Sequence, residues 1–428
     1  MFRGVRHAKS DPPFPISCCS HCVLRRGLWR RWRERWGSVS SSTAGFLNRY
    51  FLINAQAFLG PLQLPPNGPP PDAALRGLAL TPDSSQLVVA DFGAQSVYLI
   101  NPDGSAYNGK AVSVGGVSGF LNSGPARVTA TSAQTIFVGL SGEGGSAGPC
   151  SGCLGQINIL ASPPTFAPAP QPEVSSLTGT PLLQGDVAGD VAYLAYNTSP
   201  GGPVAVWNAA TPNVFSVSNA EGTAMDLAAA ADGTSFAARA NNTTEIRGGN
   251  LVLSSIPAAP ELEVIPGRIA VPGIALHPSD ALIYEPFLDG PPPAALPVTG
   301  IRGGIDIRDA HSGVLRLRVY LPEPFAMLNN DVDGVHGQFL TTDGNGQRLF
   351  AITTSGLTIV QLADVPLGIG TLSPSSGASS GGTLVAIRGS GFQTGIKATL
   401  GGKSASVTVQ DMNTAILTTP VLSLDPSN

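Results

Sequence analysis

Short apolar segments alternate with turn signals along most of the chain, and the arrangement repeats about every fifty residues. The clearest copy has apolar segments at Leu78–Thr81, Leu87–Asp91 and Ser96–Asn101, separated by turns rich in Pro, Asp and Gly. Related phrases begin near Val128, Leu183, Leu227, Ile274 and Phe339. Short apolar runs bounded by such turns are typical of β-strands, and a strand repeat of this length predicts a β-propeller or a related β array.

The repeat units lie at roughly 77–123, 124–178, 179–219, 220–266, 267–325 and 335–366. The segment 48–60 resembles the later strands of a unit that lacks its first ones. The sequence therefore predicts an all-β propeller over residues 44–366, with six recognisable blades plus a partial one, nearest to seven-bladed. Because a propeller usually pairs its chain ends within one blade, strands from 48–60 are expected beside strands from 335–362. Helical spacing of apolar residues is almost absent, which argues against a parallel βαβ fold.

The chain changes character after about Gly368, where short alternating strands are separated by turn signals every eight to twelve residues. This spacing predicts an immunoglobulin-like β-sandwich over 367–428. The characteristic residues of the tail are Pro374, Gly377, Gly381-Gly-Thr383, Ile387, Gly389, Gly391-Phe392, Gly401-Gly402, Val407 and Thr418-Thr-Pro420. In these residues the tail resembles the IPT/TIG family of immunoglobulin-like modules, whose chains normally continue through further strands, so this domain is expected to be truncated at its C-terminus.

The clearest blade is also similar to a known family. Its phrase Leu87-Val-Val-Ala-Asp-Phe-Gly-Ala-Gln-Ser-Val-Tyr-Leu-Ile-Asn101 resembles the YVTN repeats of surface-layer and lactonase-like propellers. The similarity is strongest in 77–104, fair in 271–287 and 335–362, and weak between them. It consists mostly of apolar pattern and turns, so it indicates a fold more than an activity.

Residues 1–43 stand outside the repeat and carry much of the positive charge. The first fifty residues hold ten basic and two acidic residues, a formal +8, whereas the rest hold fourteen basic and twenty-six acidic residues, −12. The segment 25–36 contains three of the four tryptophans, and one interpretation is a basic amphipathic segment that lies on an anionic membrane surface. We favour a disordered or non-native N-terminal segment, because the amino-acid composition changes abruptly near Ser38–Thr43 and the basic, Trp-rich character does not return. The acidic body lacks a basic stripe, which argues against nucleic acid as a partner.

Five cysteines occur, and only Cys150 and Cys153 lie in the body. A C-x-x-C pair can be a zinc half-site, a redox dithiol or a local disulfide. A zinc site would need a second pair of ligands, which the body lacks. A thioredoxin-like redox dithiol would lie at the start of a helix that follows a strand, whereas this pair lies in a Gly-rich loop. We therefore expect a local disulfide or two idle thiols.

Ionisable residues near strand ends are the candidates for catalysis, because the inner strands of a propeller line an axial channel. Asp331 and Asp333, in the phrase Asn329–His336, are weak candidates for a metal site; no glutamate follows at the spacing of an EF-hand. His277 belongs to a turn found throughout the repeat, which favours a structural role. The full set comprises Asp91, Asp186, Asp190, Asp226, His277, Glu285, Asp306, His311, Asp331, Asp333 and His336.

No nucleophile elbow, phosphate cradle or catalytic cluster stands out, so we assign no catalytic residue and expect no cofactor. A propeller joined to an IPT/TIG-like module resembles exported bacterial surface proteins. That resemblance implies an extracellular or cell-surface binding protein for a protein or carbohydrate ligand, and we expect a monomer. No export signal is visible in this N-terminus, and no apolar run is long enough to span a membrane. The alternative implied by the YVTN resemblance is a lactonase-like hydrolase with its site at the propeller axis.

Overall fold

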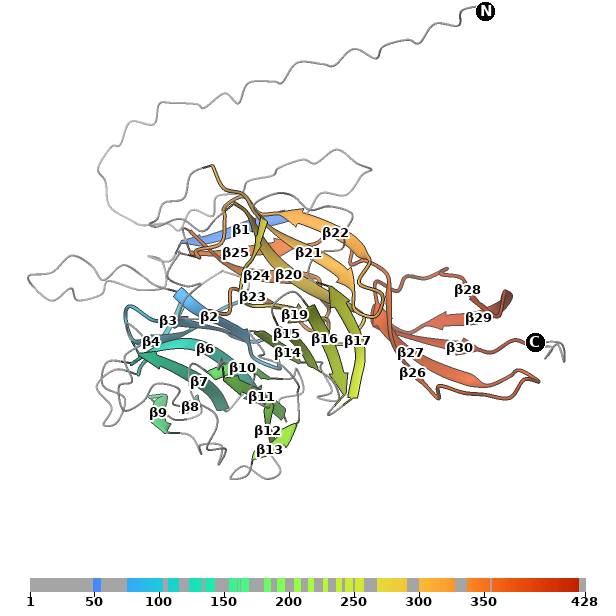
Figure 1. Cartoon of the computed structure of the whole chain (residues 1–428), viewed down its shortest axis with the longest axis horizontal. Helices are drawn as coiled ribbons and strands as arrows, with labels where there is room; N and C mark the ends of the chain where they lie inside the picture. Colours follow the sequence, from blue (N-terminus) through green and yellow to red (C-terminus); the bar gives the residue numbers. More distant parts are fainter. Residues whose placement is uncertain are drawn as a thin grey trace, which may run out of the picture. The chain divides into compact units, whose positions relative to one another are not determined.

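In the computed structural model every regular element of the described residues is a β-strand, as the sequence predicted (Figure 1). The structure describes residues 49–54, 75–102, 107–114, 123–132, 135–142, 154–159, 161, 163–168, 181–185, 191–196, 204–208, 215–218, 226–229, 236–240, 243–248, 251–257, 268–290, 300–327, 337–354 and 356–422.

The strands up to residue 361 form six antiparallel sheets in the part of the chain that is described. Each of the first four sheets consists of consecutive strands, whereas the sixth also recruits the N-terminal strand. The first sheet contains β2 (Leu75–Leu80), β3 (Leu87–Asp91), β4 (Ser96–Ile100) and β5 (Tyr107–Ser113), and the second contains β6 (Ser123–Ser132), β7 (Thr135–Gly142), β8 (Leu154–Asn158) and β9 (Thr165–Pro168). The third contains β10 (Pro181–Gly185), β11 (Val191–Tyr196), β12 (Val204–Asn208) and β13 (Phe215–Ser218), and the fourth contains β14 (Asp226–Ala229), β15 (Phe236–Ala240), β16 (Thr243–Gly248) and β17 (Leu251–Pro257). The fifth contains β18 (Arg268–Ala270), β19 (Ala275–Leu276), β20 (Leu282–Asp289), β21 (Gly303–Asp309) and β22 (Leu315–Tyr320), and the sixth contains β1 (Arg49–Asn54), β23 (Leu340–Thr342), β24 (Arg348–Thr353) and β25 (Gly356–Gln361).

The six sheets are the blades of a closed propeller. An inner strand of each sheet contacts an inner strand of the next, in the order β2, β6, β10, β14, β19 and β23, and β23 contacts β2. Blades packed on both faces bury their strands completely, which is why all five residues of β3 are buried. Apolar side chains of neighbouring blades share one core, as Val88 and Leu99 do with Val128 and Val138.

Strand β1 closes the ring. It pairs with β25 along its whole length, from Arg49 opposite Gln361 to Asn54 opposite Gly356. This confirms the predicted pairing of strands from 48–60 with strands from 335–362. It also corrects the expected count nearest to seven: within the described residues β1 is the outer strand of the sixth blade, not part of a seventh. Closure in this way gives the outer edge of β25 a partner.

Removal of β1 should leave that edge open. We expect a chain that begins at residue 55 to unfold at lower temperature and to aggregate, because an unpaired, largely apolar strand edge recruits other chains. A chain that begins at residue 44 is the matched control and should stay monomeric. Size-exclusion chromatography with light scattering measures the difference. Equal behaviour of the two chains would show that β1 does not hold the ring closed.

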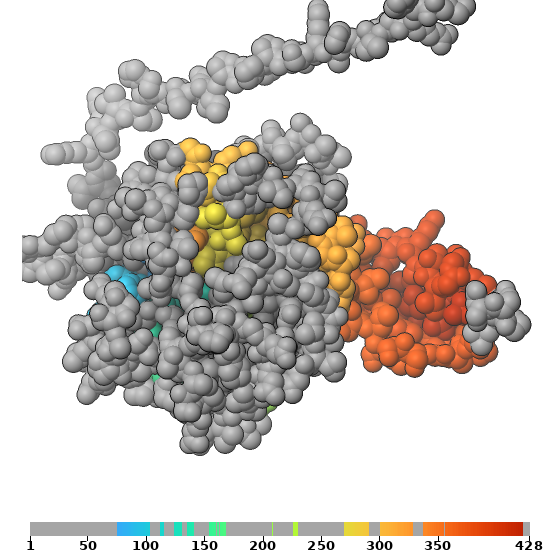
Figure 2. All heavy atoms as spheres, viewed as in Figure 1, coloured from blue at the N-terminus to red at the C-terminus, as the bar shows by residue number. Residues whose placement is uncertain are grey.

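A seventh sheet follows the propeller in sequence, with the strand order β26-β27-β30-β29-β28. Its apolar cluster is small and centres on Val385, Ile387, Phe392 and Leu417. In Figure 2 the atoms of this sheet are drawn in orange to red. The strands are β26 (Gly368–Ser373), β27 (Leu384–Ser390), β28 (Ala398–Leu400), β29 (Lys403–Val409) and β30 (Thr414–Thr418).

Candidate binding site at the propeller axis

The innermost strands bring two charged residues together at the axis. Arg127 of β6 and Asp226 of β14 form an ion pair with 2.9 Å between Nη1 and Oδ1, and both side chains are fully buried. The backbone amides of Gly273 and Ile274 donate to Oδ2 of the same carboxylate, the latter at 2.8 Å. The amide of Leu227 donates to Oδ1 at 3.1 Å. Blades two, four and five are thus joined across the axis through one carboxylate.

The inner strand of the fifth blade is interrupted so that its amides can turn toward Asp226. Gly273 lies between β18 and β19 with φ of +102°, a conformation that favours glycine, and a Cβ there would overlap the backbone of Phe339. The amide of Phe339 donates to the carbonyl of Pro272 at 3.1 Å, and the amide of Gln338 donates to the carbonyl of Arg76 at 2.6 Å. The inter-blade bonds therefore continue from blade five through blade six to blade one.

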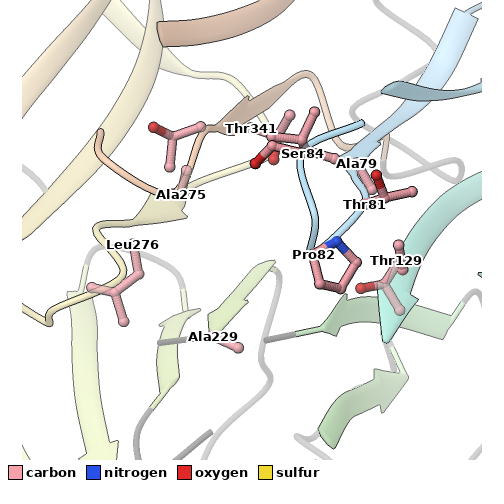
Figure 3. Close-up of a pocket in the computed structure, with 13 residues that line it drawn as sticks. Ala79, Thr81, Pro82, Ser84, Thr129, Ala229, Ala275, Leu276 and Thr341 are labelled. Atoms are coloured by element: carbon pink, nitrogen blue, oxygen red, sulfur yellow. The ribbon is translucent and has the colours of Figure 1, made fainter. Parts of the chain in front are cut away.

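A pocket opens where the same strands end. It has a volume of about 40 Å³ and is lined by side chains from β2, β6, β14, β19 and β23 and from the turns that follow β2 and β23. Figure 3 shows the labelled side chains converging on this opening from separate strands. Its lining consists of hydroxyl-bearing and small apolar residues: Ala79, Leu80, Thr81, Pro82, Ser84, Thr129, Ala130, Ala229, Ala275, Leu276, Thr341, Thr342 and Gly344.

His277 lies directly after β19 and has a structural role in its turn. Burial lowers its pKa to about 4, although the carbonyl of Asn345 and the carboxylate of Asp343 favour the charged form. Nδ1 accepts from the amide of Ser279 at 3.2 Å, so the proton of the neutral ring belongs on Nε2, which is 3.1 Å from the oxygen of Asn345. His277 therefore joins the turns of blades five and six as a neutral hydrogen-bonding group.

The same two turns hold the seventh sheet. The hydroxyl of Ser279 donates to the carbonyl of Gly389, and Nδ2 of Asn413 donates to the carbonyl of Gly344 at 3.3 Å. Met412 packs against the propeller core. Gly344 also lines the axial pocket, so one residue of the propeller contacts both the pocket and the seventh sheet.

Gly370 of β26 is the tightest point of this junction, because a Cβ there would overlap the carbonyl oxygen of Ser279. We expect Gly370→Ala to force β26 away from the turn and to destabilise the junction by about 1–3 kcal/mol, as overpacking does elsewhere. Limited proteolysis of the connection 364–370 should become faster. Thr371→Ala, an exposed position in the same strand, is the control. Cleavage at the same rate in both variants would contradict the tight contact.

The predicted site residues that the structure describes lie at several separate places. Asp226 lies at the axis, whereas Asp91 is buried in the first blade and accepts from the amide of Ala94 at 3.0 Å. His311 is exposed, in the turn after β21. Among the described residues, no three His, Cys, Asp or Glu residues lie together as a metal site would need. The candidates Asp186, Asp190, Asp331, Asp333 and His336, with Cys150 and Cys153, lie outside the described residues.

Two of the candidates share a partner in the fifth blade. Arg308 of β21 donates through Nε to Glu285 at 3.0 Å and through Nη2 to Asp306 at 3.0 Å, and Arg318 of β22 donates to the same Asp306 through Nε at 2.6 Å. These side chains lie on three adjacent strands, β20, β21 and β22. Their charges are neutralised by one another, so this cluster stabilises the blade.

Sequence reasoning missed Arg127, Thr129 and Thr341. Arg127 carried a signal, since it is the one charged residue in the strand-like run 125–130. Its partner is 99 residues away, and only the closed ring brings the two together. The threonines carried no signal, because threonine is common in strands for reasons of shape alone.

Comparisons with known proteins support the family assignment that the sequence predicts for the seventh sheet. Among solved structures, the chain is similar to hydrazine synthase of Kuenenia stuttgartiensis (TM-score 0.39, 14% identity, 68% of this chain and 76% of that one). It is also similar to the β-propeller domain of Cps50 (Swd1) of Myceliophteria thermophila (TM-score 0.42, 11% identity, 67% and 82%). No curated protein matches significantly, and the described residues contain no helix suited to crossing a membrane. The profile of the IPT/TIG domain matches residues 367–428, which identifies the seventh sheet as an IPT/TIG domain, as its sequence predicted.

Proposed function

We propose that this protein is an exported or cell-surface binding protein without catalysis, in which the propeller and the IPT/TIG domain are the binding platforms. In this proposal residues 44–366 are the propeller, 367–428 are the IPT/TIG domain, and 1–43 take no part. The chain is a monomer that binds a protein or a carbohydrate. The resemblance of 77–104 to YVTN repeats and the IPT/TIG match support an extracellular or surface location.

The chemistry of the axis is the observation that carries the proposal. The described lining of the axial pocket contains hydroxyl and aliphatic groups. The charged side chains at the axis, Arg127 and Asp226, form an ion pair with each other. A hydrolase would need a general base or a metal-bound water at the reacting bond. A surface of hydroxyls and methyl groups is suited to binding by hydrogen bonds and contact, which supports a binding role.

The rival proposal, a lactonase-like hydrolase, can be separated from binding by one comparison. Purified full-length protein is offered a panel of lactones, and in parallel is immobilised and exposed to glycans and to surface proteins. We expect saturable binding and no turnover. Turnover that is lost when Asp226 is changed to asparagine, in a variant that still folds, would establish the hydrolase and refute our proposal.

A further inference from the structure

Two buried threonines contribute hydroxyl groups to the lining of the axial pocket. Thr129 of β6 is 1% exposed and Thr341 of β23 is 6% exposed, and both line the pocket. Within the described part of the chain, neither hydroxyl forms a hydrogen bond with another protein group. By contrast, the hydroxyl of Thr81 donates to Asp83 at 2.6 Å, and that of Thr342 donates to the carbonyl of Arg348 at 3.2 Å. A hydroxyl that lines a pocket and is bonded to no described residue can donate to, or accept from, a group that enters the pocket.

The partner should be uncharged. The described pocket-lining residues include no ionisable side chain. The carboxylates next to them in sequence, Asp83 and Asp343, accept hydrogen bonds within their own turns, and Arg127 is paired with Asp226. A charged group placed here would lose its hydration without gaining a counter-charge from the described lining, which disfavours its binding. A hydroxyl can both donate and accept, which matches two threonine hydroxyls that can do the same.

The size of the pocket limits what can enter. A volume of about 40 Å³ holds about three water-sized groups. A hydroxymethyl group or one edge of a sugar ring fits, whereas a whole sugar does not. The remaining lining offers methyl and methylene groups, from Ala79, Ala275 and Leu276 among others, for contact with the C–H face of such a ring.

We propose that the axial pocket binds the terminal residue of an uncharged sugar through the hydroxyls of Thr129 and Thr341. This inference rests on the proposed binding function and names its ligand class. The sugar has two sources, a free monosaccharide or the exposed end of a glycan chain. The ring lies at the pocket mouth in both cases, with a hydroxymethyl or hydroxyl group inside.

The test uses the full chain and a panel of neutral monosaccharides, neutral oligosaccharides and sialic or uronic acids, measured by ligand-observed NMR and calorimetry. Thr129→Val and Thr341→Val remove one hydroxyl each at nearly constant volume. We expect each to weaken binding of neutral sugars about tenfold, the value of one ordinary hydrogen bond. Thr408→Val, the same change on an exposed position of β29, is the control and should bind as the parent does. Ala229→Leu, which fills the pocket, should abolish binding.

The outcomes separate the two proposals. Tighter binding of oligosaccharides than of monosaccharides identifies a glycan end, and equal binding identifies a free sugar. Binding of acidic sugars as strong as that of neutral ones, unchanged binding in both valine variants, or binding of no sugar at all would overturn the inference and leave a pocket filled by water. If the inference fails in one of these ways but the chain still binds a protein partner, the proposed binding function is retained. Turnover of a lactone would refute the proposed function itself.

Discussion

Replacement of Arg127 with alanine is expected to destabilise the propeller by about 3–5 kcal/mol, because the variant leaves the carboxylate of Asp226 buried without its counter-charge. Neither side chain of this pair has measurable exposure to solvent. The amides of Gly273, Ile274 and Leu227 would remain as donors, but they carry no full charge. The loss should appear in the free energy of unfolding from urea denaturation at pH 7.

The matched control for this prediction is Arg316→Ala. Arg316 also pairs with an aspartate, Asp309, at 2.8 Å, but its side chain is 41% exposed. Exposed ion pairs contribute about 0–1 kcal/mol, so this variant should be nearly as stable as the parent. If the two variants lose equal stability, the axial pair does not hold the blades together.

Acidification from pH 7 to pH 4 should cost the protein about 3 kcal/mol through His277 alone. Its pKa is about 4 in the folded protein and 6.5 in an ordinary histidine, because burial disfavours the charged ring. Between these values the unfolded chain binds the proton more readily than the folded one, so stability falls as the pH decreases through this window. The shift of about 2.5 pKa units corresponds to about 3 kcal/mol.

His277→Asn removes this titration and is expected to reduce the loss of stability between pH 7 and pH 4 relative to the parent. Urea denaturation at both pH values measures the difference. His311→Asn, at an exposed position, should show the same pH dependence as the parent. An unchanged pH dependence in His277→Asn would mean that the ring accepts a proton without cost.

The sequence predicted the fold where local patterns determine it. The turn Thr81–Gln86 has its own bonds, with Asp83 accepting from the amide of Ser85 at 3.0 Å and Thr81 closing the turn onto Gln86. Such bonds lie within a few residues of one another, so the residue types alone indicate the turn. The number of blades depends instead on the partner of β1, about three hundred residues away in sequence. No local signal distinguishes the outer strand of the last blade from the start of another one.

The candidate site was less accessible to sequence reasoning for the same reason. Asp226 was recognised as an ionisable residue near a strand end, but its role follows from Arg127 and Gly273, which belong to other blades. Thr129 and Thr341 gain their meaning only because the ring places both at one opening. Convergence of distant strands, not residue type, defines this site.

The antiparallel register of β1 and β25 determines how the propeller responds to mechanical tension. Arg49, the first residue of β1, is opposite Gln361, the last residue of β25, so the chain enters and leaves this pair at the same end. A force that pulls the N-terminal segment away from the IPT/TIG domain therefore loads the hydrogen bonds one after another, from Arg49 toward Asn54. Unzipping of this kind needs much less force than shearing all the bonds at once. Under load the ring would open at its sixth blade while the other five remain folded.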